Sequence, residues 1–282
     1  MKIIHNCSIF SFHKQYCLNI HQELLDRGHK SIIETSGKRY KNVDFTIQPD
    51  ENSTKLGGTG IWIGHALPVI PQNKFYLENK FYSDLHKNSN YIFTFSDEWK
   101  DWHKIHNLPT YNVGIPKLDN LFGKISGGCI LFAPTHHKKP NVYSANKVNV
   151  KRLYNFGYDV IERGHPAYHN NKISLLDSLK QSSIVISDYS SIGLEAIILN
   201  IPTILIGDKK WRDSKYNHIS ARAEKAAIRV YNHDDLEKAI EIYQSNPNYL
   251  EEERIKYSKL LCDYQGKSSK KFVDVLESLS NA

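Results

Sequence analysis

The sequence predicts an α/β protein built from two Rossmann-like domains that face each other across a cleft. The chain opens with a strand, a helix and a second strand, the pattern of a parallel α/β sheet. The alternation starts again after Gly127 and Gly128. Five polar loops directly follow apolar runs, namely GHALP, SDEW, APTHHKK, RGHP and SDYSS. Ligands of such sheets bind beyond the carboxyl ends of the strands, so these loops are where we expect a site.

The first half of the chain, residues 1–124, is expected to form the N-terminal domain. Residues 2–10 form a predicted strand. Residues 13–29 form a predicted helix, because Tyr16, Ile20 and Leu24 recur at helical spacing before Gly28. The further predicted strands are 31–35, 42–48, 60–64 and 91–96, and residues 98–107 are a predicted short helix.

The second half, residues 125–266, is expected to form a second α/β domain that begins at the two glycines. Its predicted strands are 129–134, 159–166 (ending in a loop), 184–188 and 202–208. Its predicted helices are 173–182, 191–200, 234–244 and 247–258. Residues 267–282 contain a last amphipathic helix, which we expect to pack back toward the N-terminal domain.

Composition limits the function classes. The 282 residues carry a formal net charge of +7, but the positive residues are scattered, so no nucleic-acid stripe is predicted. A modest basic excess fits an anionic substrate or an anionic membrane surface equally well. The four cysteines form no CxxC pair and are expected to be buried or incidental thiols. With no signal peptide and no apolar stretch of about 18 residues, we expect a cytoplasmic protein, and peripheral contact with the inner face of the membrane stays open.

The SDYSS loop is the first candidate site. Asp188 ends an apolar run, and Ser190 or Ser191 is the expected N-cap of the next helix. Free N–H groups at a helix start attract anions, so a phosphate can bind here. Glu195 lies one turn from Ser191 on the same helix face, where it could accept hydrogen bonds from a ribose. The alternative is an ordinary capped helix.

Histidine loops are the second candidate. His165 follows Arg163 and Gly164 and precedes a proline, so it could bond a phosphate or protonate a leaving group. His65 in GHALP belongs to the other half and could face His165 across the cleft. The alternative for each is an ordinary loop histidine. The APTHHKK loop contains a double histidine, but no third ligand has a typical spacing, so we expect no zinc.

Together these motifs resemble the CDP-glycerol glycerophosphotransferase family. The resemblance rests on RGHP, the helix after it, VISDYSSIGLEAIILNIPTIL, ILFAPTHHK, YNVGIPKLDNLF and DYQGKSSKKFVDVL, over roughly residues 60 to 280. It implies a glycosyltransferase-B-type fold and a teichoic-acid or capsule primase or polymerase. The chain departs from the family pattern at three places, two of them in the acceptor half. GHALPVI replaces the family's Trp-His-Gly-Thr-Pro-Leu-Lys, Lys117 replaces an arginine, and His-His-Lys-Lys follows Ala-Pro-Thr.

The resemblance also implies a reaction. An acceptor hydroxyl attacks the β-phosphorus of a CDP-alcohol, most simply CDP-glycerol, and CMP leaves. His65 would be the general base and His165 would bond the phosphate. The implied donor-binding residues are Thr135, Arg163, Gly164, Asp188, Ser190, Ser191 and Glu195. The residues implied in acceptor binding or charge stabilisation are Lys117, His136, His137 and Lys138. No metal ligands are implied, and a need for a divalent cation stays open.

Three alternatives remain at this point. One is a nucleotide-sugar-dependent glycosyltransferase of the same fold, and a second is a UDP-sugar epimerase with the same two-domain layout. The third is a non-catalytic domain that only binds a nucleotide or a polymer. Two histidines expected at one cleft argue against pure binding, because binding alone needs no titratable pair. The acceptor, expected to be a glycan or lipid-linked hydroxyl, and the number of units added are not given by the sequence.

Overall fold

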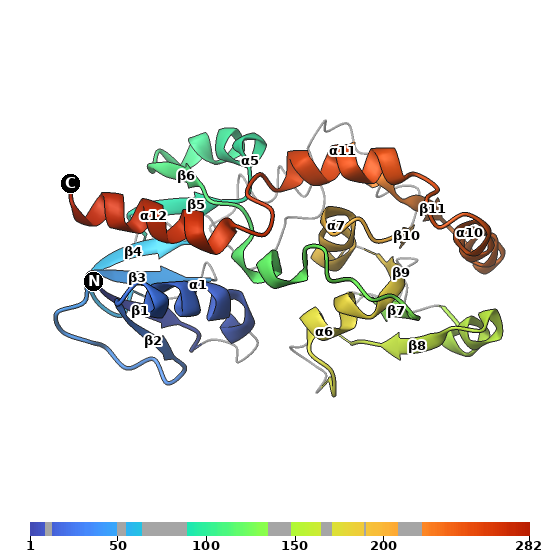
Figure 1. The fold of residues 1–282 in the computed structure, drawn as a ribbon, viewed down its shortest axis with the longest axis horizontal. Coiled ribbons are helices and arrows are strands. Elements are labelled where there is room, and N and C mark those ends of the chain that lie inside the picture. Colours follow the sequence, from blue (N-terminus) through green and yellow to red (C-terminus); the bar gives the residue numbers. More distant parts are fainter. Residues whose placement is uncertain are drawn as a thin grey trace. The chain divides into compact units, whose positions relative to one another are not determined.

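A computed structural model of the chain describes residues 1–8, 13–49, 55–63, 89–134, 148–164, 171–188, 190–207 and 222–282. It contains two compact units, each with its own sheet (Figure 1). Among the described residues, the first unit takes the chain up to Asn120 together with Cys262–Ala282, and the second takes Leu121–Leu261. The α/β class with two separate parallel sheets is therefore confirmed.

The first unit is built on a six-stranded parallel sheet in the order β2-β1-β3-β4-β5-β6. The strands are β1 (Lys2–Asn6), β2 (Lys30–Glu34), β3 (Phe45–Gln48), β4 (Thr59–Trp62), β5 (Tyr91–Thr94) and β6 (Thr110–Asn112). The order reverses between β1 and β3. In open α/β sheets the crevice at such a switch point, beyond the carboxyl ends of the strands, is the usual place for a ligand.

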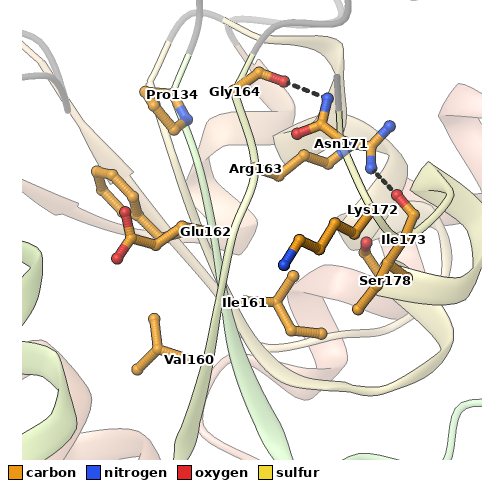
Figure 2. Close-up of a pocket in the computed structure, with 11 residues that line it drawn as sticks. Pro134, Val160, Ile161, Glu162, Arg163, Gly164, Asn171, Lys172, Ile173 and Ser178 are labelled. Carbon is orange, nitrogen blue, oxygen red and sulfur yellow. Dashed lines mark hydrogen bonds between the residues drawn. The ribbon is translucent and has the colours of Figure 1, made fainter. Parts of the chain in front are cut away.

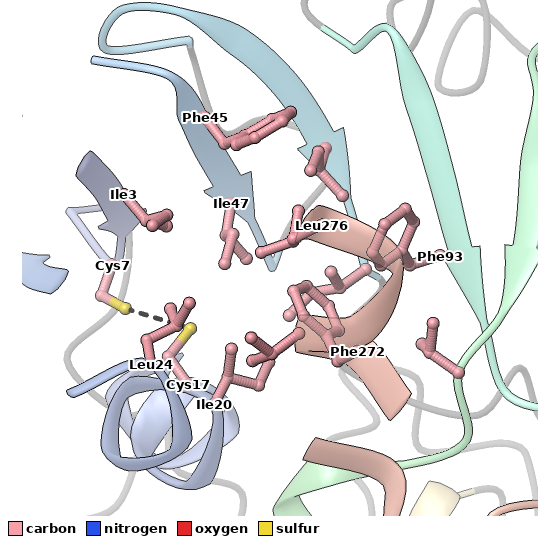
Figure 3. Close-up of a cluster of buried hydrophobic side chains, with 14 residues drawn as sticks. Ile3, Cys7, Cys17, Ile20, Leu24, Phe45, Ile47, Phe93, Phe272 and Leu276 are labelled. Atoms are coloured by element: carbon pink, nitrogen blue, oxygen red, sulfur yellow. Dashed lines mark hydrogen bonds between the residues drawn. The ribbon is translucent and has the colours of Figure 1, made fainter. Parts of the chain in front are cut away.

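One face of this sheet packs against α1 (Lys14–Asp26) and α12 (Ser268–Ser280). Figure 3 shows the core that they share, with Ile3 and Ile47 from the sheet, Ile20 from α1 and Phe272 from α12. The buried stripe of α1 is Cys17, Ile20 and Leu24, so the predicted helix is confirmed. The expected place of Tyr16 in that stripe is wrong, because the smaller Cys17 takes the buried position and Tyr16 stays half-buried.

The second unit is built on a five-stranded parallel sheet in the order β11-β10-β9-β7-β8. The strands are β7 (Cys129–Ala133), β8 (Asp159–Glu162), β9 (Ser182–Ser187), β10 (Thr203–Ile206) and β11 (Ile228–Val230). The switch point lies between β7 and β9. Gly127 and Gly128, just before β7, both have positive φ angles, 69° and 113°, which explains why this turn needs glycine.

Helices cover both faces of the second sheet. The amphipathic α10 (His233–Ser245) packs against Ile204, Ile206 and Val230 on one face. On the other face α7 (Ser191–Ile198) contacts β9 and β10, with α11 (Glu251–Leu261) against α7, and α6 (Leu175–Lys180) contacts β9. The sheet is thus buried on both sides, which explains why its strands are nearly continuous apolar runs.

Several elements differ from the predictions. The first strand ends at Asn6 instead of residue 10, where the Asn6 side chain accepts hydrogen bonds from Ser8. The helix predicted at 247–258 begins at Glu251, after Leu250 takes a positive φ of 62°. The predicted helix at 98–107 is α5 (Asp97–Trp102) followed by the 3₁₀ turn η2 (His103–His106). The three-residue strands β6 and β11 and three 3₁₀ helices, η3 (Pro116–Leu121), η5 (Val150–Phe156) and η6 (Glu224–Ala226), were not expected.

All four cysteines are free and buried, as predicted. Cys7 and Cys17 lie in the first core, with their sulfur atoms 3.8 Å apart. No helix among the described residues is long and apolar enough to cross a membrane.

Candidate functional site at the carboxyl edge of the second sheet

The loops APT and SDYSS begin side by side at the switch point of the second sheet. They follow β7 and β9, which are hydrogen-bonded neighbours. The hydroxyl of Ser187, the last residue of β9, donates a hydrogen bond of 2.8 Å to the carbonyl oxygen of Ala133, the last residue of β7. Asp188 follows and is buried. The two strand ends are therefore held in a fixed position, and both loops leave from one place.

The helix that follows SDYSS begins as the sequence predicts. Ser190 is the N-cap of α7, and its hydroxyl accepts from the backbone N–H of Ile192 at 3.4 Å, so the cap is Ser190 and Ser191 is the first helical residue. A Cβ atom on Gly193 would lie 2.7 Å from the Leu205 side chain, so glycine lets α7 pack closely on the sheet. The first turn of α7 thus lies at the carboxyl edge, with backbone N–H groups and a positive helix end.

Glu195 lies on the inner side of α7 and is fully buried. Carboxylates are rarely buried to this extent unless they are paired or used. Ser191, one turn earlier, is half-buried. The predicted contacts with phosphate and ribose would therefore involve one half-buried side chain, Ser191, and one fully buried side chain, Glu195, on the same helix.

The next loop along the edge, after β8, is closed at its base by two hydrogen bonds (Figure 2). The Arg163 guanidinium donates to the carbonyl oxygen of Ile173, and the Asn171 amide donates to the carbonyl oxygen of Gly164 at 2.9 Å. The backbone N–H of Arg163 donates a hydrogen bond of 2.9 Å to the carbonyl oxygen of Phe132, which continues the pairing of β8 with β7. Arg163 is buried, so its charge serves here to join the two ends of the segment 165–170. This role was not predicted for Arg163.

A pocket of about 630 Å³ opens beside β8, the outer strand of the sheet. It has an apolar part from Phe132, Val160, Ile161 and Ile173 and a polar part that includes Glu162 and Lys172 (Figure 2). Arg163, Gly164 and Asn171 also line it, so it adjoins the closed base of the loop.

Lys117, the candidate in the first unit, is a buried cation. It lies in η3, and its Nζ atom is 4.0 Å from the centre of the Tyr16 ring. The neighbouring Asp119 accepts the backbone N–H groups of Ser268 at 2.9 Å and Ser269 at 2.6 Å, so it caps α12. Burial raises the pKa of the Asp119 carboxyl, although these serines act in the opposite direction. The stretches GIPKLD and GKSS are therefore in contact through Asp119 and Ser268, which are 149 residues apart in the sequence.

Six of the predicted site residues lie outside the described residues: His65, Thr135, His136, His137, Lys138 and His165. Where the structure is described, no three His, Cys, Asp or Glu side chains are arranged to hold a metal ion.

The sequence matches the profile of the CDP-glycerol:poly(glycerophosphate) glycerophosphotransferase family over residues 94–278, which is 185 of 282 residues. The chain belongs to this family. The matched region includes the whole second sheet, Lys117 and α12. It excludes β1 to β4 and the altered stretch GHALPVI at residues 64–70, whereas the other two departures from the family pattern, Lys117 and residues 136–139, lie inside it.

Individual relatives agree with this assignment. The chain is 27% identical over 124 residues to a teichoic acid glycerol-phosphate primase of Staphylococcus aureus, a match covering 40% of this chain and 33% of the primase. It thus spans about a third of that curated relative. The wall teichoic acid polymerase TagF superposes with a TM-score of 0.71 at 15% identity, over 98% of this chain and 88% of TagF. The UDP-GlcNAc 2-epimerase of Neisseria meningitidis superposes with a TM-score of 0.59 at 13% identity, over 99% and 100%.

At such low identity the structural likenesses show the fold alone. They confirm the predicted fold, which the family shares with the glycosyltransferase SpnP (TM-score 0.56, 12% identity, 100% of both chains). Among residues of this edge, sequence reasoning missed Ser187 and Asn171, and in the first unit it missed Asp119. Asp119 had a signal, because it is the acidic residue of the stretch similar to the family's Gly-x-Pro-Arg-x-Asp. Asn171 had none, since its partner lies across a loop.

Proposed function

We propose that the protein is a transferase that moves glycerol phosphate, or a related polyol phosphate, from a CDP-alcohol to a hydroxyl group of a glycan or lipid-linked acceptor and releases CMP. Family membership over residues 94–278 supports this reaction, and the observation that carries it is the arrangement of the second sheet. There a serine-capped helix start and a partly apolar pocket flank the same carboxyl edge. We assign donor binding to the second unit and acceptor binding to the first.

The dimensions of the edge suit a nucleoside diphosphate. From β9 across β7 to β8 is two strand spacings, or roughly 10 Å. A pyrophosphate at the start of α7 would therefore leave its nucleoside within reach of the pocket beside β8. The apolar side chains Val160, Ile161 and Ile173 suit the faces of a base, and glycerol has no apolar face that would need them.

The chemistry then needs one base and a well-held phosphate. The acceptor hydroxyl gives its proton to His65, its oxygen bonds to the β-phosphorus, and the bond from that phosphorus to the bridging oxygen breaks, so CMP leaves with the electron pair. His165, next to Gly164, would bond the transferred phosphate and stabilise the charge that develops. Ser190 and Ser191 would hold the pyrophosphate. Phosphoryl transfer depends mostly on such positioning and charge stabilisation.

The contacts of Arg163 and Lys117 change the roles that we assign to these two residues. Arg163 already binds Ile173, so we assign it to holding the loop before His165, from which it supports the donor site. Lys117 is buried over Tyr16, so a charge-stabilising role would act through the field of the first unit. Thr135, Asp188 and Glu195 keep their proposed donor-side roles. His136, His137 and Lys138 keep their proposed roles in acceptor binding or charge stabilisation.

The reaction is tested by product release. We expect the purified full chain to release CMP from CDP-glycerol or CDP-ribitol when a polyol-phosphate acceptor is present, and no UDP from UDP-sugars. Cytidine nucleotides should also raise the melting temperature more than uridine or guanosine nucleotides, because a ligand at 100 times its Kd stabilises by about 2.7 kcal/mol. UDP release from a UDP-sugar, or equal shifts for all nucleotides, would reject the proposal.

The place of the reaction follows from its substrates. We propose that the protein works in the cytoplasm and meets a lipid-linked acceptor at the inner face of the membrane, which its net charge of +7 would favour. Sedimentation with vesicles tests this. Binding to vesicles with anionic lipid that is lost at high salt is expected, and no binding to any vesicle would contradict membrane contact.

A further inference from the structure

The carboxyl edge of the first sheet ends in a row of polar side chains. Asn6, Gln48, Trp62 and Thr94 are the last residues of β1, β3, β4 and β5, which are adjacent strands. His5 of β1 pairs with Ile47 of β3, so the next residues of the two strands, Asn6 and Gln48, are aligned. Gln48 in turn pairs with Trp62 of β4. Trp62 pairs with Ile92, so Thr94 lies two residues further along the same face of β5. The row starts at the switch point between β1 and β3.

This row is on the face opposite the main core. In β3, β4 and β5 the preceding residues, Ile47, Ile61 and Phe93, belong to the core shared with α1 and α12. In β1 the preceding residue, His5, has its ring against His21 of α1. Because side chains alternate, the row faces the other way, where Trp62 and Ile92 form a small cluster with Leu108. The row is buried, with exposed fractions of 0% for Asn6, 1% for Gln48, 6% for Trp62 and 1% for Thr94. Strands of a buried parallel sheet are normally apolar on both faces, so a buried polar row needs a reason.

Part of the row has hydrogen-bonding capacity that the protein does not use. Asn6 is bonded to Ser8, and Gln48 accepts from the Ser89 hydroxyl at 3.1 Å. In contrast, Trp62 Nε1 and the Thr94 hydroxyl are buried and have no hydrogen-bond partner among the residues that the structure describes.

The same holds for Ser96, two residues after Thr94. Its hydroxyl is also buried and has no partner in the described part of the chain, and although Ser96 is the N-cap of α5, its side chain makes no capping bond. Buried donors without partners are costly, and three of them at one strand edge indicate a ligand rather than three separate defects.

The chemistry of the row selects the class of ligand. It offers carboxamides, an indole N–H and hydroxyl groups, and it contains no charged side chain. Such groups bond to neutral hydroxyls, and an indole adds a flat surface for C–H groups. An anion is disfavoured here, because α5, the helix that starts beside the row, carries Asp97 and Glu98 in its first turn.

We propose that Asn6, Gln48, Trp62, Thr94 and Ser96, here called the polar row, bind the neutral hydroxyl groups of a polyol or sugar. If the proposed transferase function is correct, this ligand is the hydroxyl-bearing end of the acceptor. The binding itself does not depend on that function. It places acceptor recognition on uncharged groups, at the edge of the unit whose histidine loop departs most from the family pattern.

The kinetic test compares two threonines of the same sheet. Thr94→Val removes a hydroxyl without a protein partner, so we expect unchanged or higher stability, an unchanged KM for CDP-glycerol and an acceptor KM raised about 3- to 10-fold. Thr46→Val is the matched control. The buried Thr46 hydroxyl donates to the carbonyl oxygen of Gly57, so this variant should lose stability and keep its acceptor KM. An unchanged acceptor KM in Thr94→Val would overturn the proposal.

A direct test works even if no transfer is detected. The indole ¹⁵N–¹H signal of Trp62, assigned with Trp62→Phe, is followed while glycerol, ribitol or a methyl glycoside is added to the full chain. We expect a saturable shift with at least one of them and a smaller response to inorganic phosphate. No shift with any neutral hydroxyl compound, or a shift with phosphate alone, would overturn the proposal. A Trp62 response in a protein that releases no CMP would reject the transferase function and leave the polar row standing.

Discussion

The two units have the same strand order around their switch points, yet their carboxyl edges differ in chemistry. In the second unit a capped helix start and a partly apolar pocket flank the edge. In the first, α1 follows β1 without any side-chain capping bond at its N-cap, and the edge is formed by the neutral polar row. Topology thus fixes where a ligand can bind, and the residues at the strand ends decide whether it is an anion or a hydroxyl compound.

This difference also follows the family match. The profile begins at residue 94, so it covers the complete second edge and, of the first sheet, only β6 and the last residue of β5. A chain can keep its donor chemistry and change its acceptor by altering a few residues at the ends of β1, β3 and β4.

Substitution of His65 and of His165 should give the largest difference between the two units. If His65 is the base, His65→Ala should lower turnover by ~10²–10⁴ and leave donor affinity nearly intact. If His165 bonds the donor phosphate, His165→Ala should weaken donor binding as well as turnover. CMP release and donor affinity of both variants check this. Wild-type turnover by His65→Ala on its true acceptor would show that His65 is only a loop residue.

Gly114 should matter to the first unit alone. It has a φ of 77°, and a Cβ atom there would collide with the Ser268 hydroxyl at the start of α12. Gly114→Ala should therefore cost about 2–5 kcal/mol, the sum of a left-handed alanine and overpacking. Gly28→Ala is the matched control, since its φ is 78° and no atom lies within 4 Å, so it should cost only about 1–2 kcal/mol.

Urea unfolding measures both costs, and calorimetry measures the donor affinity. Equal losses for the two variants would show that the contact with α12 is not tight. A donor affinity that falls with Gly114→Ala would contradict donor binding by the second unit alone.

His5 should make the first unit sensitive to acid. Burial, with a smaller effect of His21, lowers the pKa of His5 from 6.5 to about 3. As pH falls below about 6.5 the unfolded chain binds a proton that the folded chain does not, so His5 lowers stability by about 1.4 kcal/mol per pH unit until its folded pKa is reached.

The uncharged variant His5→Gln, which can still bond the Ser31 hydroxyl, should flatten this dependence. Urea unfolding between pH 7 and about 4.5 compares the two proteins within that range. Identical slopes would mean that His5 is protonated in the folded state.

Substitution of Ser190 should have the smallest effect on stability and should change ligand binding at the second edge only. Loss of its cap in Ser190→Ala should cost about 1 kcal/mol of stability. Asn232→Ala removes the cap of α10 in the same unit and should cost a similar amount. Only Ser190→Ala should also weaken CDP-glycerol binding, and a donor affinity lowered equally by both would point to general destabilisation.

Much of the fold was predictable because its strands are apolar runs between clear helix signals. The edge to which we assign the donor could also be located from the sequence, since SDYSS and RGHP are each a contiguous segment at the end of a strand. The cap of α12 by Asp119 was not, because it joins residues about 150 positions apart. Neither was the polar row. Four of its members end four different strands, and Ser96 follows β5. Inside runs such as FTIQ or GIWIG each strand member looks like an ordinary strand residue until the register aligns them. The short strands β6 and β11 were missed because three residues show no alternation.

The central claim, that the second edge binds a cytidine donor independently of the first, is tested most directly by calorimetric titration of CDP-glycerol into the wild type, Ser190→Ala and Thr94→Val. We predict tighter binding of CDP-glycerol than of UDP-glucose by the wild type, affinity about fivefold weaker in Ser190→Ala, as a loss of about 1 kcal/mol implies, and wild-type affinity in Thr94→Val. Equal affinity for the two nucleotides, or a donor affinity that falls as much in Thr94→Val as in Ser190→Ala, would contradict the account.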